Sequence, residues 1–235
     1  MSGKETKKLD TAIVVAIIGV LGTIIAALIA SPVFGKLFEE TTVPNVDVPT
    51  VGDNGLVFVN DFENGQASGF AFSSEEWQVM KDKGNQVLEM SGTGSENSTA
   101  VFGPNDFSNG EIIFRINFKN LGGFILNFRS SVDVQTYTLY LAPASGEITL
   151  GYGNATNDWN LEPFEGDSIR PFQFNEGSWY QVKLQASGGQ MTVWMDGNKI
   201  LSGTDVRLEL GSMEFAIQSD GTVWLDEVEV WEYSN

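Results

Sequence analysis

A hairpin in the C-terminal third of the chain most constrains what this sequence can fold into. Residues 179–197 read WYQVKLQASGGQMTVWMDG, with apolar side chains at every second position on both sides of Gly188-Gly189. A period of two is typical of antiparallel strands that bury one face, and a Gly-Gly pair supplies the positive φ angles of a tight turn. Asp196-Gly197 predicts a second turn. The stretch therefore predicts paired strands in a sheet with one buried side.

The same alternation continues through the middle of the chain, in residues 111–118, 124–129 and 136–141. One set of side chains is apolar and predicts a core, while the other set is largely polar. We expect a single polar face that carries Arg115, Asn117, Asn127, Arg129, Thr138 and Tyr140. Because two packed sheets each need an inner and an outer side, residues 54–235 are predicted to form an all-β, two-sheet antiparallel sandwich.

The N-terminal region has a different composition. Residues 11–30, TAIVVAIIGVLGTIIAALIA, contain no charge, and a helix of that length matches the hydrocarbon core of a bilayer, about 30 Å. Three lysines lie within residues 1–10, so the positive-inside rule predicts a cytoplasmic tail, a single transmembrane helix and an extracytoplasmic domain at the cell membrane. Residues 31–53, rich in acids and chain breakers, predict a stalk. The alternative is a cleaved signal peptide that ends near Ala30.

Small residues recur at every fourth position of the apolar span, at Gly22, Ala26 and Ala30. Such a stripe lets two spanning helices approach closely, so it predicts a helix–helix partner in the membrane.

Composition and charge exclude several classes of function. The chain has no histidine and no cysteine, which removes Ser-His-Asp catalysis, His or Cys zinc sites, thiolate chemistry and disulfides. Residues 1–36 hold four lysines and two acids, and the remainder holds nine basic and 29 acidic residues, a net charge of −20. Since an acidic body repels phosphate backbones, nucleic acid is not expected as a partner.

The last strands carry a resemblance to a known family. Residues 211–231, GSMEFAIQSDGTVWLDEVEVW, resemble the closing pattern G-x-I-G-L-Q-x-x-G-x-V-x-F-D-x-V-x-V of concanavalin-A-like jelly rolls, and residues 179–197 resemble their W-h-x-V … V-x-V-x-x-D-G hairpin. These folds include laminin-G modules, pentraxins and 3-keto-disaccharide hydrolase-like domains, and the pattern is most similar to the last. The resemblance covers residues 56–233 and implies a jelly roll whose activity is open, because the fold hosts lectins, enzymes and scaffolds.

Candidate ligand-binding residues follow from what sugars require, which is aromatic faces and planar polar groups. The polar strand faces and the long loop at residues 153–175 supply Asn127, Arg129, Tyr140, Trp159 and Gln218. In 3-keto-disaccharide hydrolase-like domains a Gly-x-x-x-x-Arg strand contributes to the sugar cleft. Gly123 to Arg129 resembles that strand with slightly altered spacing.

No catalytic residues are assigned, and the sequence leans against an enzyme. Glycoside hydrolysis needs two suitably spaced carboxylates, but the E-x-D-x-x-E signature of the jelly-roll glucanases is missing. The acids of Asp226-Glu227-Val228-Glu229 are interpreted as a solvated strand face. Asp61 and Glu63, after the first strand, and Asp226, in the last, are candidate ligands of a structural calcium ion; no other cofactor is expected. Asn97 and Asn154 begin glycosylation sequons.

Three functions remain open at this point. The first is a membrane-anchored extracytoplasmic module that binds glycan or another surface partner. The second, which only the resemblance implies, is a sugar-active hydrolase or lyase of the 3-keto-disaccharide hydrolase type. The third is a structural subunit of a membrane assembly, docked through the stripe of small residues.

Overall fold

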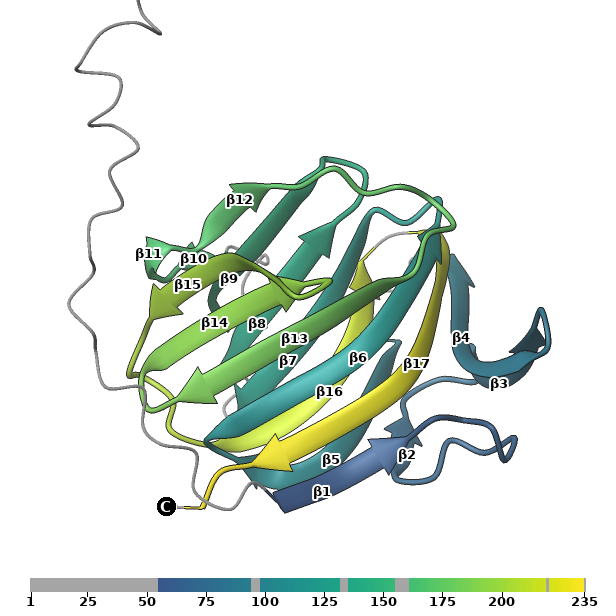
Figure 1. The fold of residues 1–235 in the computed structure, drawn as a ribbon, viewed down its shortest axis with the longest axis horizontal. Coiled ribbons are helices and arrows are strands. Elements are labelled where there is room, and N and C mark those ends of the chain that lie inside the picture. The colour runs from purple at the N-terminus through teal and green to yellow at the C-terminus, as the bar shows by residue number, and fades with distance from the viewer. Residues whose placement is uncertain (1–54, 94–97, 132–134, 155–160, 219, 235) are drawn as a thin grey trace, which may run out of the picture. The chain divides into compact units, whose positions relative to one another are not determined.

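The computed structural model describes residues 55–93, 98–131, 135–154, 161–218 and 220–234. They form two antiparallel sheets packed face to face (Figure 1). In the nine-stranded sheet, drawn in front, the order is β11 (Glu165–Asp167), β15 (Asn198–Thr204), β14 (Gln190–Met195), β13 (Tyr180–Ser187), β6 (Gly110–Lys119), β17 (Asp220–Glu232), β4 (Asn85–Thr93) and β3 (Trp77–Asp82), and β1 (Gly55–Asn60) also pairs with β17.

The eight-stranded sheet lies behind the first. Its order is β10 (Glu162–Pro163), β9 (Glu147–Asn154), β8 (Gln135–Ala142), β7 (Gly123–Ser130), β16 (Gly211–Gln218), β5 (Thr99–Phe107) and β2 (Phe70–Phe72), and β12 (Ile169–Pro171) also pairs with β9. The all-β, two-sheet antiparallel sandwich predicted from the alternation is therefore confirmed.

The hairpin that anchors the prediction is present as β13 and β14. Val182 pairs with Met195 and Ser187 pairs with Gln190, so the turn is Gly188-Gly189. Of these two glycines, Gly188 has the positive φ, 54°. At the next turn, between β14 and β15, both central residues have positive φ, as Asp-Gly turns require.

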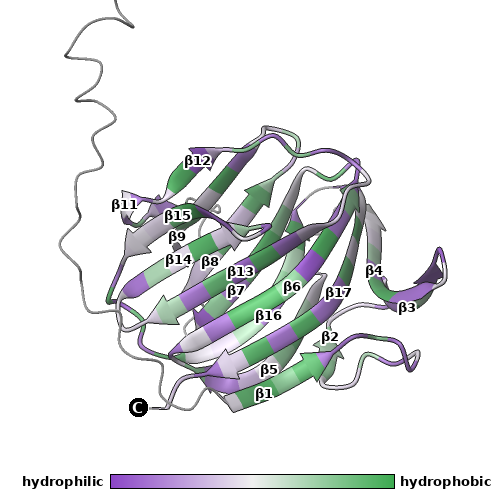
Figure 2. Cartoon of the chain, in the orientation of Figure 1, coloured by the Kyte–Doolittle hydropathy of each residue, from purple (hydrophilic) through white to green (hydrophobic). Residues whose placement is uncertain are grey.

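One core fills the space between the sheets. Its buried side chains come from both inner faces, including Phe114 and Val182 from one sheet and Leu126 and Phe215 from the other. Along the front strands apolar and polar residues alternate, as Figure 2 shows, so each strand gives one side to the core. Because both sheets and this core lie within residues 51–235, which cluster as one compact unit, we expect this segment to fold by itself.

The expected single polar face is wrong. Arg115 and Asn117 belong to β6 in the nine-stranded sheet, whereas Asn127, Thr138 and Tyr140 belong to β7 and β8 in the other sheet. The chain crosses between the sheets after β6, so alternation identified an outer side in each strand but could not show that these sides lie on opposite surfaces of the sandwich.

Several expectations fall outside the described residues. The tail, the span at 11–30 with Gly22, Ala26 and Ala30, and the stalk are among them, as are Asn97 and Trp159. Asn154 is the last residue of β9. Within the described ranges no helix has the length and apolar character needed to cross a membrane.

Candidate functional site

Tyr140 and Gln218 meet on the outer side of the eight-stranded sheet. The Tyr140 ring reaches from β8 across Gly123 of β7, where an added side-chain carbon would come within 2.3 Å of the phenol oxygen. Glycine at this position therefore lets the ring lie against the sheet. The Tyr140 hydroxyl then donates to Oε1 of Gln218 on β16, at 2.6 Å. Burial, followed by the nearby Glu147 carboxylate, raises the pKa of Tyr140.

A second polar group stands further along the same strands. Nδ2 of Asn127 donates to Oε1 of Glu214 at 2.8 Å, and the Thr138 hydroxyl donates to Oδ1 of Asn127 at 2.6 Å. Asn127 is 2% exposed and Thr138 is fully buried, whereas Glu214 is half-buried. Asn127 and Thr138 therefore position the Glu214 carboxylate from below and leave part of it open to solvent.

Two buried apolar residues lie between these two groups. Ala216 pairs with Ile125, and both are buried on the outer side of the sheet, between Glu214 and Gln218. Four residues along a strand separate those two α-carbons by about 13 Å. We call this area the Glu214 surface; it comprises Gly123, Ile125, Asn127, Thr138, Tyr140, Glu214, Ala216 and Gln218.

Arg129 does not belong to the Glu214 surface. The register of β7 against β16 shifts between Asn127 and Ser130, and Arg129 in this bulge has φ 52°, the left-handed region. Gly211 on β16 passes so close that a side-chain carbon there would lie 2.3 Å from the Ser130 carbonyl oxygen. The bulge re-aims the arginine toward the end of the sandwich.

The guanidinium of Arg129 bonds to backbone carbonyls there. Nε donates to Ser108 at 2.9 Å, Nη1 donates to Gly188 at 2.9 Å and to Leu208 at 3.1 Å, and Nη2 also donates to Ser108. The side chain is 1% exposed, and burial lowers its pKa. Arg129 thus ties three connecting segments together and borders a pocket between them.

The structure therefore brings together Asn127, Tyr140 and Gln218 of the five predicted ligand-binding residues, and places Arg129 elsewhere. Trp159 lies outside the described residues. Glu214 was missed, although a signal was present: it stands four residues before Gln218 in an alternating strand, so the two side chains must share a face.

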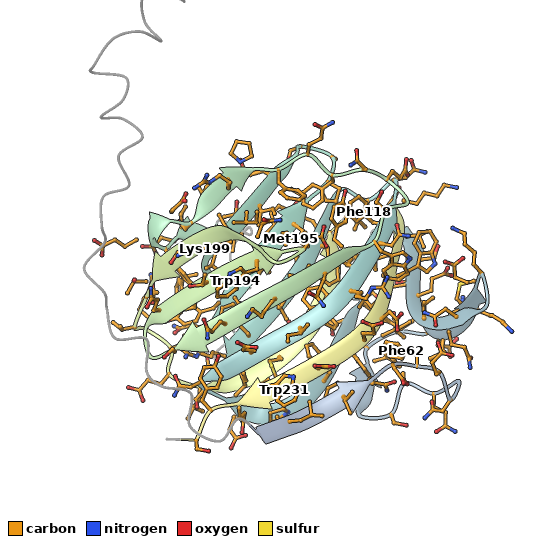
Figure 3. All side chains as sticks on the ribbon, in the orientation of Figure 1. Phe62, Phe118, Trp194, Met195, Lys199 and Trp231 are labelled. Atoms are coloured by element: carbon orange, nitrogen blue, oxygen red, sulfur yellow. The ribbon has the colours of Figure 1, made fainter. Side chains whose placement is uncertain are left out.

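The outer side of the nine-stranded sheet is different in character. It carries four half-buried tryptophans, which we call the tryptophan face: Trp179, Trp194, Trp224 and Trp231. Figure 3 labels Trp194 on β14 and Trp231 on β17. The ammonium of Lys183 lies 4.4 Å from the Trp194 ring centre, and Arg115 lies 5.2 Å from that of Trp179.

Carboxylates accept hydrogen bonds from the other two indoles of this face. Nε1 of Trp224 donates to Glu89 at 2.7 Å, and Nε1 of Trp231 donates to Glu229 at 2.8 Å. All four tryptophans therefore have charged partners from their own sheet, which is a common way to stabilise an exposed sheet face.

The acids proposed for calcium are not gathered into a metal site. The Asp226 carboxylate accepts a hydrogen bond from Nδ2 of Asn85 at 2.7 Å. The Glu63 carboxylate accepts from the backbone N–H of Gln86 at 3.0 Å, and the Asp61 carboxylate accepts from the backbone N–H of Glu63. Among the residues that the structure describes, no group of three or more acidic side chains is placed to hold a metal ion.

No family model and no curated protein matches the sequence. Solved structures match in fold. A Bacillus subtilis protein of unknown function with a galectin-like fold is 14% identical, with TM-score 0.57 over 77% of this chain and 98% of that one. The β-glucanase of Bacillus licheniformis is 11% identical, with TM-score 0.55 over 77% and 99%.

Domain 4 of AbnA, an extracellular arabinanase of Geobacillus stearothermophilus whose structure holds arabinotriose, is 13% identical, with TM-score 0.54 over 77% of this chain and 93% of that one. At such low identity these likenesses establish the fold alone. The described part of residues 55–234 forms a concanavalin-A-like, galectin-like β-sandwich, a fold shared with this arabinanase domain and with a β-glucanase.

Proposed function

We propose that this protein is a saccharide-binding module and that the Glu214 surface is its binding site. The observation that carries the proposal is that one sheet surface holds both the Tyr140 ring, laid across Gly123, and the half-open Glu214 carboxylate, four residues from Gln218 along β16. An aromatic face suits the apolar side of a sugar ring. The Glu214 carboxylate can accept hydrogen bonds from sugar hydroxyls, and the Gln218 amide can both accept and donate them. Domain 4 of AbnA, which binds arabinotriose, supports the proposal at the level of the fold.

The direct test is a glycan array probed with residues 51–235. We expect at least one saccharide class to bind. The variants Glu214→Gln and Tyr140→Ala should each weaken that binding by about tenfold or more, the effect of losing one charged hydrogen bond or one stacking surface. Glu75→Gln, the same chemical change at an exposed residue between β2 and β3, serves as the matched control. No binding on the array, or equal binding by Glu214→Gln and Glu75→Gln, would contradict the proposal.

Hydrolysis of the 3-keto-disaccharide type is the second candidate. Its support is the half-open carboxylate of Glu214 on a fold that glucanases share. Against it, Arg129, which ends the strand that resembles the sugar-cleft strand of that family, bonds to carbonyls at the end of the sandwich. Incubation with glycosides and 3-keto-glycosides separates the two functions. If the protein turns over one of these substrates and Glu214→Gln abolishes the turnover, the function is catalysis rather than binding. If none is turned over, the binding proposal stands.

We propose further that the module is held outside the cell membrane by residues 11–30, with Gly22, Ala26 and Ala30 facing a partner helix. The uncharged span and the lysines before it support this orientation. Protease added to intact cells should remove the C-terminal domain and leave an N-terminal tag protected. Digestion of the tag, or a mature chain that begins near Ser31, would contradict the anchor. Replacing Gly22 and Ala26 by Leu should disrupt co-purification of any partner.

A further inference from the structure

A pocket of about 420 Å³ opens at the end of the sandwich where Arg129 lies. Its walls come from three connections: Ser108 and Asn109 between β5 and β6, Gly188 and Gly189 between β13 and β14, and Val206, Leu208, Glu209 and Leu210 between β15 and β16. The volume falls within the range of about 300–1,000 Å³ that small-molecule sites occupy. None of the lining residues belongs to the Glu214 surface, so this is a separate candidate site.

The cation beneath this pocket forms no direct ion pair within the described residues, and the Glu209 carboxylate at the rim acts on it only from a distance, partly opposing the lowering of its pKa. In the described part of the chain no carboxylate oxygen lies within 4.0 Å of Arg129. Its bonds to three carbonyls use four of the five guanidinium N–H groups, which leaves one Nη2–H without a partner among the described residues. Because an unpaired buried charge is costly, a ligand that brings one negative charge and one acceptor would offset that cost.

The rim of the pocket is apolar and exposed. Val206 is 77% exposed and Leu210 is 54% exposed, and Leu208 is buried beside them. Glu209, also at the pocket, is exposed and carries a negative charge. A ligand here would meet one cation below, apolar side chains around it and one carboxylate at the edge, so a single anionic group is favoured over two.

We propose that the Arg129 pocket binds a small monocarboxylate with an apolar body. The carboxylate accepts from Arg129, and the body covers Val206 and Leu210. The proposal does not depend on saccharide binding at the Glu214 surface, and it gives a function to two exposed apolar side chains that contribute nothing to the core.

The test is an NMR titration of ¹⁵N-labelled residues 51–235 with hexanoate. We expect saturable shifts of the Gly188, Gly189 and Leu208 amides, and weaker effects from hexanol, which lacks the charge, and from galacturonate, whose body is polar. Hexylamine should not compete. The rim residues are exposed, so variants there should fold as the parent does.

Glu209→Gln should tighten hexanoate binding by about two- to fivefold, the size of one exposed charge–charge interaction, and Val206→Asp should weaken it at least as much. Glu165→Gln, an exposed acid on β11 that does not line the pocket, should leave it unchanged. The proposal is overturned if hexanoate causes no shifts at these amides, if hexanol or galacturonate binds as well, or if Glu209→Gln weakens binding.

Discussion

The two outer sides of the sandwich satisfy their polar groups in opposite ways. On the tryptophan face, large indoles lie against charged side chains of neighbouring strands, such as Lys183 over Trp194. On the Glu214 surface, small buried groups, Asn127 and Thr138, lie beneath a carboxylate that stays half open. The aromatic rings of the tryptophan face therefore contribute to the stability of their own sheet. The Glu214 surface instead exposes part of one ring and part of one carboxylate, which buried side chains hold in place.

This difference shows that counting aromatic residues on a surface does not identify a binding site. The face with four tryptophans has the larger aromatic area, but each of these tryptophans already has a charged partner, either over its ring or at its indole N–H. A site needs groups that are held in place and still incompletely satisfied. By that criterion the Glu214 surface is the better candidate.

The largest expected difference between the two faces is in how much a lost hydrogen bond lowers the free energy of unfolding. Asn127→Leu should lower the free energy of unfolding by about 2–4 kcal/mol, because the buried Thr138 hydroxyl and the Glu214 carboxylate both lose their partner. Gln185→Leu on the other face removes a hydrogen bond from a half-buried amide to Tyr233, and should cost less than about 1 kcal/mol. Urea denaturation measures both. Similar losses would mean that the base of the Glu214 surface is not specially constrained.

A smaller effect is expected for the charged partners of the tryptophans. A double-mutant cycle of Lys183→Met and Trp194→Leu should give a coupling energy of about 0.5–1 kcal/mol. Chemical denaturation of the four proteins provides the cycle. A coupling near zero would show that the indole is not engaged by the ammonium, and would reopen the tryptophan face as a binding surface.

The smallest effects concern pH, and we consider one titrating group on each outer side of the sandwich. Burial raises the pKa of Asp226, in β17 of the nine-stranded sheet, above the usual 3.8. Between the unfolded and folded values the native state holds more protons, so stability falls as pH rises through this window. Asp226→Asn should flatten that fall, provided that Asn85 turns its amide to keep the hydrogen bond.

On the Glu214 surface the corresponding group is Tyr140, whose pKa burial raises above the usual 10.0. The unfolded chain therefore loses this proton first, and stability falls as pH rises above 10. Tyr140→Phe should make the alkaline fall of a stability–pH curve smaller, with the remainder due to Tyr137 and Tyr233, whose pKa values burial raises to about 12, and should leave the acidic part unchanged. The reverse pattern in either variant would contradict these assignments.

Alternation predicted most of the fold, because it reports directly which side of each strand is buried. It gave the hairpin at Gly188-Gly189 and the inner positions of β6, β7 and β8. It could not show which outer sides share a surface, since that depends on where the chain crosses between sheets, and so Arg115 was wrongly grouped with Asn127. Nor could it foresee the bulge at Arg129, because a single extra residue in β7 depends on the partner strand β16.

The candidate site was only partly predictable for the same reason. Tyr140 and Gln218 were recognised by residue type, but their contact requires Gly123 between them, and the importance of that glycine is evident only from the position of the ring. Glu214 was readable from its strand and was overlooked among the many acids of this chain.

The measurement that tests saccharide binding at the Glu214 surface most directly is an NMR titration of residues 51–235 with the array's best-binding saccharide. We expect shifts to cluster at Gly123, Ile125, Tyr140, Ala216 and Gln218, and to need about tenfold more saccharide or greater in Glu214→Gln but not in Glu75→Gln. Shifts that cluster instead at Trp194 and Trp231, and survive Glu214→Gln, would contradict the assignment and place the binding site on the opposite sheet.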